Sequence, residues 1–109
     1  MEWVKTELYL GRGIHAGHEV SELEFADFVS EVITKYIPKG LTIYDAYGQI
    51  QESDGKISRQ ATWIMVIVHE KIEENSHAID AVIAAYREKF GRAEVMRLTS
   101  PTDAQFYMN

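Results

Sequence analysis

The sequence contains no cysteine, which excludes disulfide bonds and thiolate chemistry. No apolar run approaches the roughly 20 residues that a membrane-spanning helix requires, so we expect no membrane partner. Positive charge is also limited, because 11 Lys and Arg residues stand against 17 Asp and Glu residues, for a net charge of −6 at pH 7. The basic residues are scattered singly. Because phosphate backbones are bound by clusters of Lys and Arg, we expect no nucleic-acid partner.

The N-terminus lacks the basic segment followed by an apolar segment that marks a secretory leader, and we therefore expect a bacterial, cytoplasmic protein. The chain has 109 residues, of which 46% are hydrophobic, enough for one domain with one core. We predict a single domain over residues 1–109, with residues 101–109 as a C-terminal tail.

The longest apolar run is Thr62–Glu70, TWIMVIVHE, and it is rich in β-branched residues. Such a run is typical of an interior strand that is covered on both faces. A strand like this needs a neighbouring strand on each side. It is therefore the element around which we expect the sheet to form.

The other elements follow from alternation, helical periodicity and turn residues. They are expected at Trp3–Leu10 (strand), Ser21 to Pro38 (helix), Leu41–Glu52 (strand), Ser76–Phe90 (helix) and Glu94–Thr99 (strand). Ser21 and Glu24 predict a capping box at the start of the first helix. Asp54-Gly55 predicts a tight hairpin turn, and Gly48 a β-bulge. Asn75 or Ser76 is the expected cap of the second helix.

The expected order is β-α-β-β-α-β. Right-handed crossovers and short connections then favour a ferredoxin-like α+β sandwich, with an antiparallel sheet of order 4-1-3-2 and both helices on one face. Strand alternation assigns one set to the helix-covered core: Leu8, Leu10, Leu41, Ile43, Ile64, Val66, Val68, Met96 and Leu98. It assigns another set to the open face: Trp3, Tyr9, Tyr44, Trp63, Met65, Ile67, His69 and Arg97.

An apolar open face predicts a partner, because soluble monomers rarely expose such a patch. We expect the partner to be a second copy, giving a homodimer or a higher homo-oligomer. The predicted interface residues are Tyr44, Trp63, Met65 and Ile67. The alternative is that the C-terminal tail folds back and covers this face alone.

Strand polarity places several polar residues at one end of the sandwich. A small-molecule ligand would contact Tyr9, Arg12, His15, His18, Gln49 or Arg59, while His69 and His77 are expected at the other end. The positive N-terminus of the first helix would favour an anionic or carbonyl group there. His15 and His18 are metal-ligating residue types, but a zinc site requires three or four ligands, so we expect no metal and no cofactor.

Two further features have a chemical and a structural interpretation. Gly11-Arg12-Gly13 follows a strand as a phosphate cradle would, but it matches no nucleotide motif, and a turn that needs glycine is favoured. Asp45 shares the alternation of Leu41 and Ile43. It would be either an inward-pointing carboxylate with a raised pKa, suited to a general base, or a residue satisfied by backbone N–H groups.

Several short motifs resemble a small bacterial family of uncharacterised domains. They are Leu8-Tyr9-Leu10-Gly11, Val20-Ser21, Pro38-Lys39-Gly40-Leu41-Thr42, Asp45, and Gly48-Gln49, continued by Phe28, Ile83, Tyr86, Phe90, Val95, Arg97 and Phe106. The resemblance spans nearly the whole chain and supports the fold without implying a reaction. Members of that family tend to have Trp where this chain has Ile50, and Glu where it has Gln60. They often carry a secretory leader.

Two functions fit these patterns. One is a small homo-oligomeric binding or interaction domain without catalysis. The other is a small enzyme of the dimeric α+β-barrel kind, in which two sheets face each other over a pocket for a small aromatic substrate. No catalytic triad or carboxylate pair is recognisable in the sequence, which favours the first.

Overall fold

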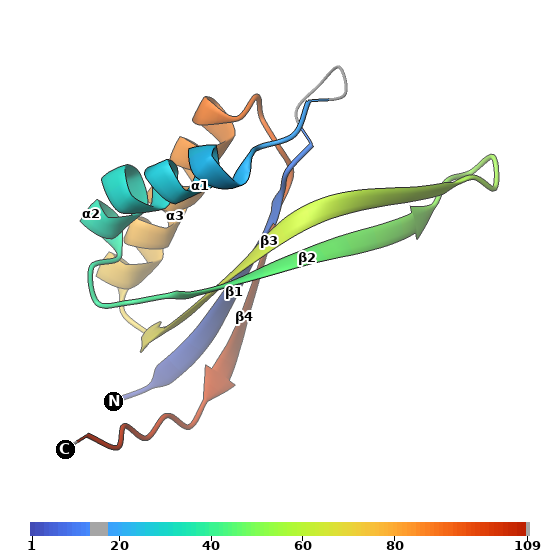
Figure 1. The fold of residues 1–109 in the computed structure, drawn as a ribbon. Helices are drawn as coiled ribbons and strands as arrows, with labels where there is room; N and C mark the ends of the chain where they lie inside the picture. The colour runs from blue at the N-terminus through green and yellow to red at the C-terminus, as the bar shows by residue number, and fades with distance from the viewer. Residues whose placement is uncertain (14–17, 109) are drawn as a thin grey trace.

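The computed structural model describes residues 1–13 and 18–108. Its elements, in chain order, are β1 (Trp3–Gly11), α1 (Glu22–Phe28), the π-helical turn η1 (Val29–Ile33), α2 (Thr34–Tyr36), β2 (Thr42–Gln51), β3 (Ile57–Glu70), α3 (Glu73–Lys89) and β4 (Val95–Thr102). The helical segments lie together against one face of the sheet (Figure 1). Within the described ranges, no helix is both long and apolar enough to cross a membrane.

The four strands form one antiparallel sheet of order β2-β3-β1-β4. This is the predicted order written from the other edge. The β3 strand lies between β2 and β1, so the prediction that Thr62–Glu70 is interior is confirmed. The α+β class and the covering of one face by helices are confirmed as well.

The first helix begins as its sequence predicts. Glu24 N–H donates to Ser21 Oγ and Ser21 N–H donates to Glu24 Oε1, both at 3.1 Å, which completes the capping box. Such a cap stabilises a helix by about 1 kcal/mol. The helix then passes through η1, where Thr34 Oγ1 donates to Val29 O at 2.9 Å. The Thr34 hydroxyl thus supplies a hydrogen-bond donor to a backbone carbonyl group of the wider π-helical turn.

The start of α3 differs from the prediction. The helix begins at Glu73 after Ile72, which makes no side-chain cap. Asn75 Nδ2 instead donates to Glu70 O at 2.9 Å, so the predicted cap at Asn75 or Ser76 is wrong. The Asn75 side chain ties the first turn of α3 back to the end of β3, an option that only the tertiary arrangement provides.

The β2–β3 hairpin turns at Asp54-Gly55 as predicted, with Gly55 at φ 89° and Lys56 N–H donating to Asp54 Oδ1 at 2.9 Å. Its pairing runs without a break from Thr42↔Val66 to Gln51↔Ile57, so the predicted bulge at Gly48 is wrong. Pairing with β1 stops at Gly11↔Thr62. Residues 47–61, which we call the arm, therefore project beyond the other strands (Figure 1).

The two faces of β3 are reversed relative to the prediction. Trp63, Met65 and Ile67 are only 6%, 0% and 3% exposed, and they lie on the helix-covered side. The cause is the register, since Met65 pairs with Leu8 and Trp63 with Leu10, and directly paired residues share a face. Trp63, Met65 and Ile67 are therefore core residues, and their assignment to the open face is wrong.

The same correction applies to β4. Leu8 pairs with Arg97, and Tyr9 pairs with Met96, so Arg97 lies on the helix side while Met96 and Leu98 lie on the open side. His69 shares the helix side with Ile67. The assignments of Leu8, Leu10, Ile43, Tyr9 and Tyr44 agree with the register.

The C-terminal tail, described as far as Met108, reaches only one end of the open face. Phe106 packs against Trp3 with ring centroids 5.4 Å apart, at the end of the sheet. Tyr107 and Met108 remain exposed, and so do Met96 and Leu98 on the face itself. The alternative in which the tail alone buries this face is therefore wrong.

Candidate functional site

The open face combines one row of side chains from each strand. The pairings place these residues on it: Trp3, Lys5, Glu7, Tyr9, Thr42, Tyr44, Ala46, Ile64, Val66, Val68, Met96, Leu98 and Ser100. Four large apolar members are well exposed, namely Tyr44 at 56%, Val68 at 42%, Met96 at 51% and Leu98 at 44%. The face is therefore apolar, as predicted, although mostly different residues form it.

A groove of about 440 Å³ lies in this face, where β1 ends and the arm begins. It is lined by Tyr9, Gly11, Ala46, Tyr47, Gly48, Gln60, Thr62, Ile64, Glu94, Val95 and Met96. Tyr9 lies opposite both Ile64 and Met96 in the register, so these three side chains form a continuous apolar floor. The volume falls within the range of about 300–1,000 Å³ that is typical of small-molecule sites.

The Tyr9 hydroxyl is held in place within the sheet face. It donates to Glu7 Oε2 at 3.1 Å. This hydrogen bond to a carboxylate, together with a smaller desolvation effect, raises the pKa of Tyr9 above its ordinary value. The phenol therefore remains protonated near neutral pH, and its oxygen still has lone pairs that accept a hydrogen bond from a ligand.

The polar end of the groove depends on two glycines. A Cβ atom on Gly13 would lie 2.9 Å from Gln60 Nε2, and one on Gly11 would lie 3.2 Å from Glu94 O. Neither glycine has the left-handed backbone that would demand glycine, so the predicted explanation by a turn is wrong. Their lack of side chains instead lets the Gln60 carboxamide lie over the end of β1.

Arg12 lies on the other side of the sheet from this groove. Its guanidinium stacks on Trp63 at 4.2 Å from the ring centroid, and its Nε donates to Val20 O at 3.0 Å. An ion pair joins Arg12 Nη1 to Asp45 Oδ1 at 3.5 Å. The Asp45 side chain is exposed, so its interpretation as an inward-pointing carboxylate is wrong.

The remaining predicted ligand residues do not converge. Arg59 Nε donates to Gln49 Oε1 at 3.1 Å. This pair lies on the arm, and its side chains are on the same face of the sheet as the helices, opposite the groove. His18 is exposed, and His15 lies outside the described residues. Strand polarity placed Tyr9, Gln49 and Arg59 at the same end of the sheet, which the pairings confirm, but it could not separate the two faces at that end.

The groove residues that were missed are Ala46, Gly48, Gln60, Thr62, Glu94 and Met96. Once the register is known, these residues are seen to lie on the same face of the sheet as Tyr9. Two of them carried a signal in the sequence: Gln60 as a departure from the family resemblance, and Gly48 as part of its Gly48-Gln49 motif.

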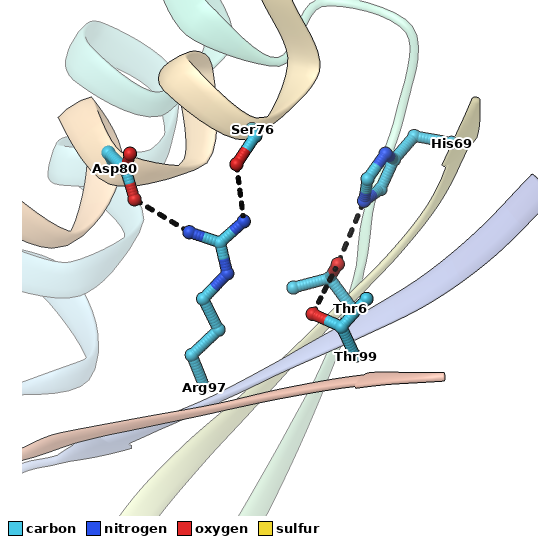
Figure 2. Close-up of polar contacts among 6 residues, drawn as sticks. All are labelled: Thr6, His69, Ser76, Asp80, Arg97 and Thr99. Atoms are coloured by element: carbon cyan, nitrogen blue, oxygen red, sulfur yellow. Dashed lines mark hydrogen bonds and ion pairs between the residues drawn. The ribbon is translucent and has the colours of Figure 1, made fainter. Parts of the chain in front are cut away.

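A polar network lies under the helices at the opposite end (Figure 2). His69 Nδ1 lies 2.8 Å from Glu70 O, and because a carbonyl oxygen only accepts, Nδ1 carries the proton in the neutral ring. His69 Nε2 then accepts from Thr6 Oγ1 at 2.8 Å, and Thr99 Oγ1 lies 3.5 Å from Thr6 Oγ1. Thr6 is fully buried, so this network fixes the strands and presents no accessible nucleophile.

Arg97 joins β4 to α3 in the same region. Its Nη1 contacts Asp80 Oδ1 at 2.6 Å and its Nη2 donates to Ser76 Oγ at 3.2 Å (Figure 2). A second groove, of about 460 Å³, runs beside His69 and Phe106. Both ring nitrogens of His69 already take part in hydrogen bonds, so the imidazole can make only van der Waals and carbon–hydrogen contacts with a ligand in this groove.

Within the described part of the chain, no three His, Asp or Glu side chains gather as metal ligands would. His15 was one of the two histidines considered for a metal, and it falls outside that part.

Comparison with solved structures identifies proteins of similar fold. A phage SAM lyase in complex with S-methyl-5'-thioadenosine aligns with a TM-score of 0.66 and 13% identity, covering 97% of this chain and 93% of the other. The apo form of a phage SAM lyase aligns with a TM-score of 0.62 and 12% identity, covering 98% of this chain and 94% of the other. GlnK of B. subtilis, in complex with ATP, aligns with a TM-score of 0.53 and 14% identity, covering 91% of this chain and 82% of the other. At these identities the likeness concerns the fold alone.

Comparison with curated proteins finds no match. Residues 5–106 match the model of a family described as a protein of unknown function (DUF3574). That span covers almost the whole domain, from the first strand to Phe106 in the tail. The chain is therefore a member of the DUF3574 family.

Proposed function

We propose that this protein is a small self-associating binding domain, in which the open faces of two copies pack together and a small ligand occupies the groove beside them. The observation that carries the proposal is the exposure of large apolar side chains on that face, from 42% for Val68 to 56% for Tyr44. Burying each such side chain fully contributes about 1.5–3 kcal/mol. Solvent exposure of the whole row is therefore unfavourable.

The face suits pairing with a second copy. A two-fold contact uses the same surface on both partners. On β1, within this surface, Lys5 and Glu7 form an ion pair, with Lys5 Nζ 3.8 Å from Glu7 Oε1. That pair neutralises the centre of the face, so two copies meet there without net repulsion. The aromatic and methionine side chains around it are types enriched in interface cores.

The test is molar mass by light scattering at micromolar concentration, for wild type and Leu98→Glu. We expect the wild type to be a dimer or larger, and Leu98→Glu to be a folded monomer with an unchanged circular dichroism spectrum. The matched control is Leu23→Glu, because Leu23 is exposed on α1, away from the open face. A strictly monomeric wild type would show that this face does not mediate self-association.

The second candidate is a small enzyme of the paired-sheet kind, acting on a small, aromatic substrate in the groove. Gln60, Thr62 and Glu94 at one end of the groove favour it, because they supply polar contacts beside an apolar floor. The phage SAM lyase and GlnK bind S-methyl-5'-thioadenosine and ATP, which illustrates that proteins of this fold accept adenosine compounds. Turnover of a bound compound would distinguish this candidate from simple binding.

A further inference from the structure

Among the described residues, nothing in the structure requires glycine at position 48. It pairs with Gln60 in an unbroken ladder, its backbone is outside the left-handed region, and an added Cβ would meet no described atom within 4 Å. Glycine inside a strand lowers stability by roughly 0.5–1 kcal/mol relative to alanine. A strand glycine without a bulge is typical of a place where a ligand or another backbone approaches closely. Gly48 lines the groove.

The shape of the groove favours a flat occupant. Ala46 and Gly48 contribute little or no side chain from β2, while Tyr9, Ile64 and Met96 form the apolar floor. A planar ring in this slot would contact an aromatic face and a thioether, both of which favour aromatic ligands. Two small residues beside a wide floor leave room for a ring.

Polar groups at one end of the groove can form hydrogen bonds with the edge of such a ring. The Gln60 carboxamide offers both a donor and an acceptor, and the Glu94 carboxylate accepts hydrogen bonds. Thr62 Oγ1 is engaged with Gln60 O at 3.4 Å, so it can still accept from a ligand. An amino group beside a ring nitrogen is the pattern that complements these groups.

The charge of the groove disfavours phosphates. No Lys or Arg belongs to the described residues that line it, and its acidic residue is Glu94. The whole protein carries a net charge of −6. A neutral or cationic compound is therefore favoured over a phosphorylated one.

We propose that the groove binds an amino-substituted heteroaromatic ring without phosphate, of the purine nucleoside type, and that Gly48 is the position of closest approach. The inference rests on the small-ligand part of the proposed function. Because the groove floor includes Met96, which also belongs to the self-association face, light scattering is measured alongside each titration.

The test is calorimetric titration of the wild-type protein with adenosine, inosine and adenosine 5'-monophosphate. We expect adenosine to bind, and inosine and the monophosphate to bind at least tenfold more weakly, because the first lacks the amino group and the second adds negative charge. No heat with adenosine at millimolar concentration, or equal affinity for all three, would overturn the proposal.

Gly48→Val tests the role of the glycine. We expect it to weaken adenosine binding at least tenfold while the thermal midpoint stays the same or rises, since valine favours strands. Ser58→Val is the control, because Ser58 lies on the same side of the arm but outside the groove. Wild-type affinity in Gly48→Val would overturn the assignment. Light scattering on the same samples separates this result from a failure of self-association.

Discussion

Met65 and Met96 provide a matched test of which face of the sheet forms the core. Both are methionines on strands, but Met65 is 0% exposed beneath the helices and Met96 is 51% exposed on the open face. Truncating a buried methionine to alanine costs about 2–5 kcal/mol, since apolar contacts are lost and a cavity remains. Truncating a half-exposed one at the surface costs much less.

The expected result follows from these magnitudes. A domain of this size has a free energy of unfolding of about 5–15 kcal/mol, so Met65→Ala removes a large part of it. With a urea dependence of about 1–3 kcal/mol per molar, the unfolding midpoint of Met65→Ala falls by roughly 1–3 M. Met96→Ala shifts the midpoint by a few tenths of a molar.

The assay is urea denaturation followed by circular dichroism, with both alanine variants made in the Leu98→Glu background so that loss of self-association does not contribute, at one fixed protein concentration. Concentration matters because a self-associating protein gains apparent stability by mass action. A midpoint for Met96→Ala that falls as far as that of Met65→Ala would refute the assignment of the two faces.

Two further predictions concern buried hydroxyl groups. Burial raises the pKa of Tyr86, partly offset by nearby Arg12, and Tyr86 OH donates to Gly11 O at 2.8 Å. Since the unfolded chain ionises its tyrosines near pH 10 while folded Tyr86 stays neutral, the stability that Tyr86 contributes is complete below that pH and is lost as the pH rises above it. The unfolding free energy of Tyr86→Phe, measured from pH 8 to 11, should fall less steeply than that of wild type, and equal slopes would contradict this. Thr6→Val should lower the unfolding free energy by about 1–3 kcal/mol in urea titration, because it leaves His69 Nε2 without its donor; Thr99→Val, which removes only a 3.5 Å contact, is the control and should cost less.

Local signals in the sequence were reliable where the cause of the structure is local. The capping box at Ser21 and Glu24 depends only on residues three apart, and it forms as expected. The turn at Asp54-Gly55 depends on a glycine with positive φ, and it also forms. The interior position of β3 follows from its apolar length, because only a strand between two others can bury that many side chains.

The two faces of β3 could not be distinguished in this way. Ile64, Met65, Val66 and Ile67 are all apolar, so alternation along the strand contains no information about which row meets the helices. One step in register exchanges every side chain between the faces. The pairing of Met65 with Leu8 settles the question, and it is a contact between distant parts of the chain.

The candidate site shows the same division. The sequence by itself determined the elements, their order and the end of the sandwich where Tyr9 lies, because these follow from propensity, periodicity and chain direction. Only the tertiary structure decided that Tyr9 meets Met96 and Gln60 in a groove while Arg12 stacks on Trp63 behind the sheet. The physical reason is that cross-strand register and the side of the sheet on which helices pack depend on the summed burial of all the strands together, and no single strand encodes that sum.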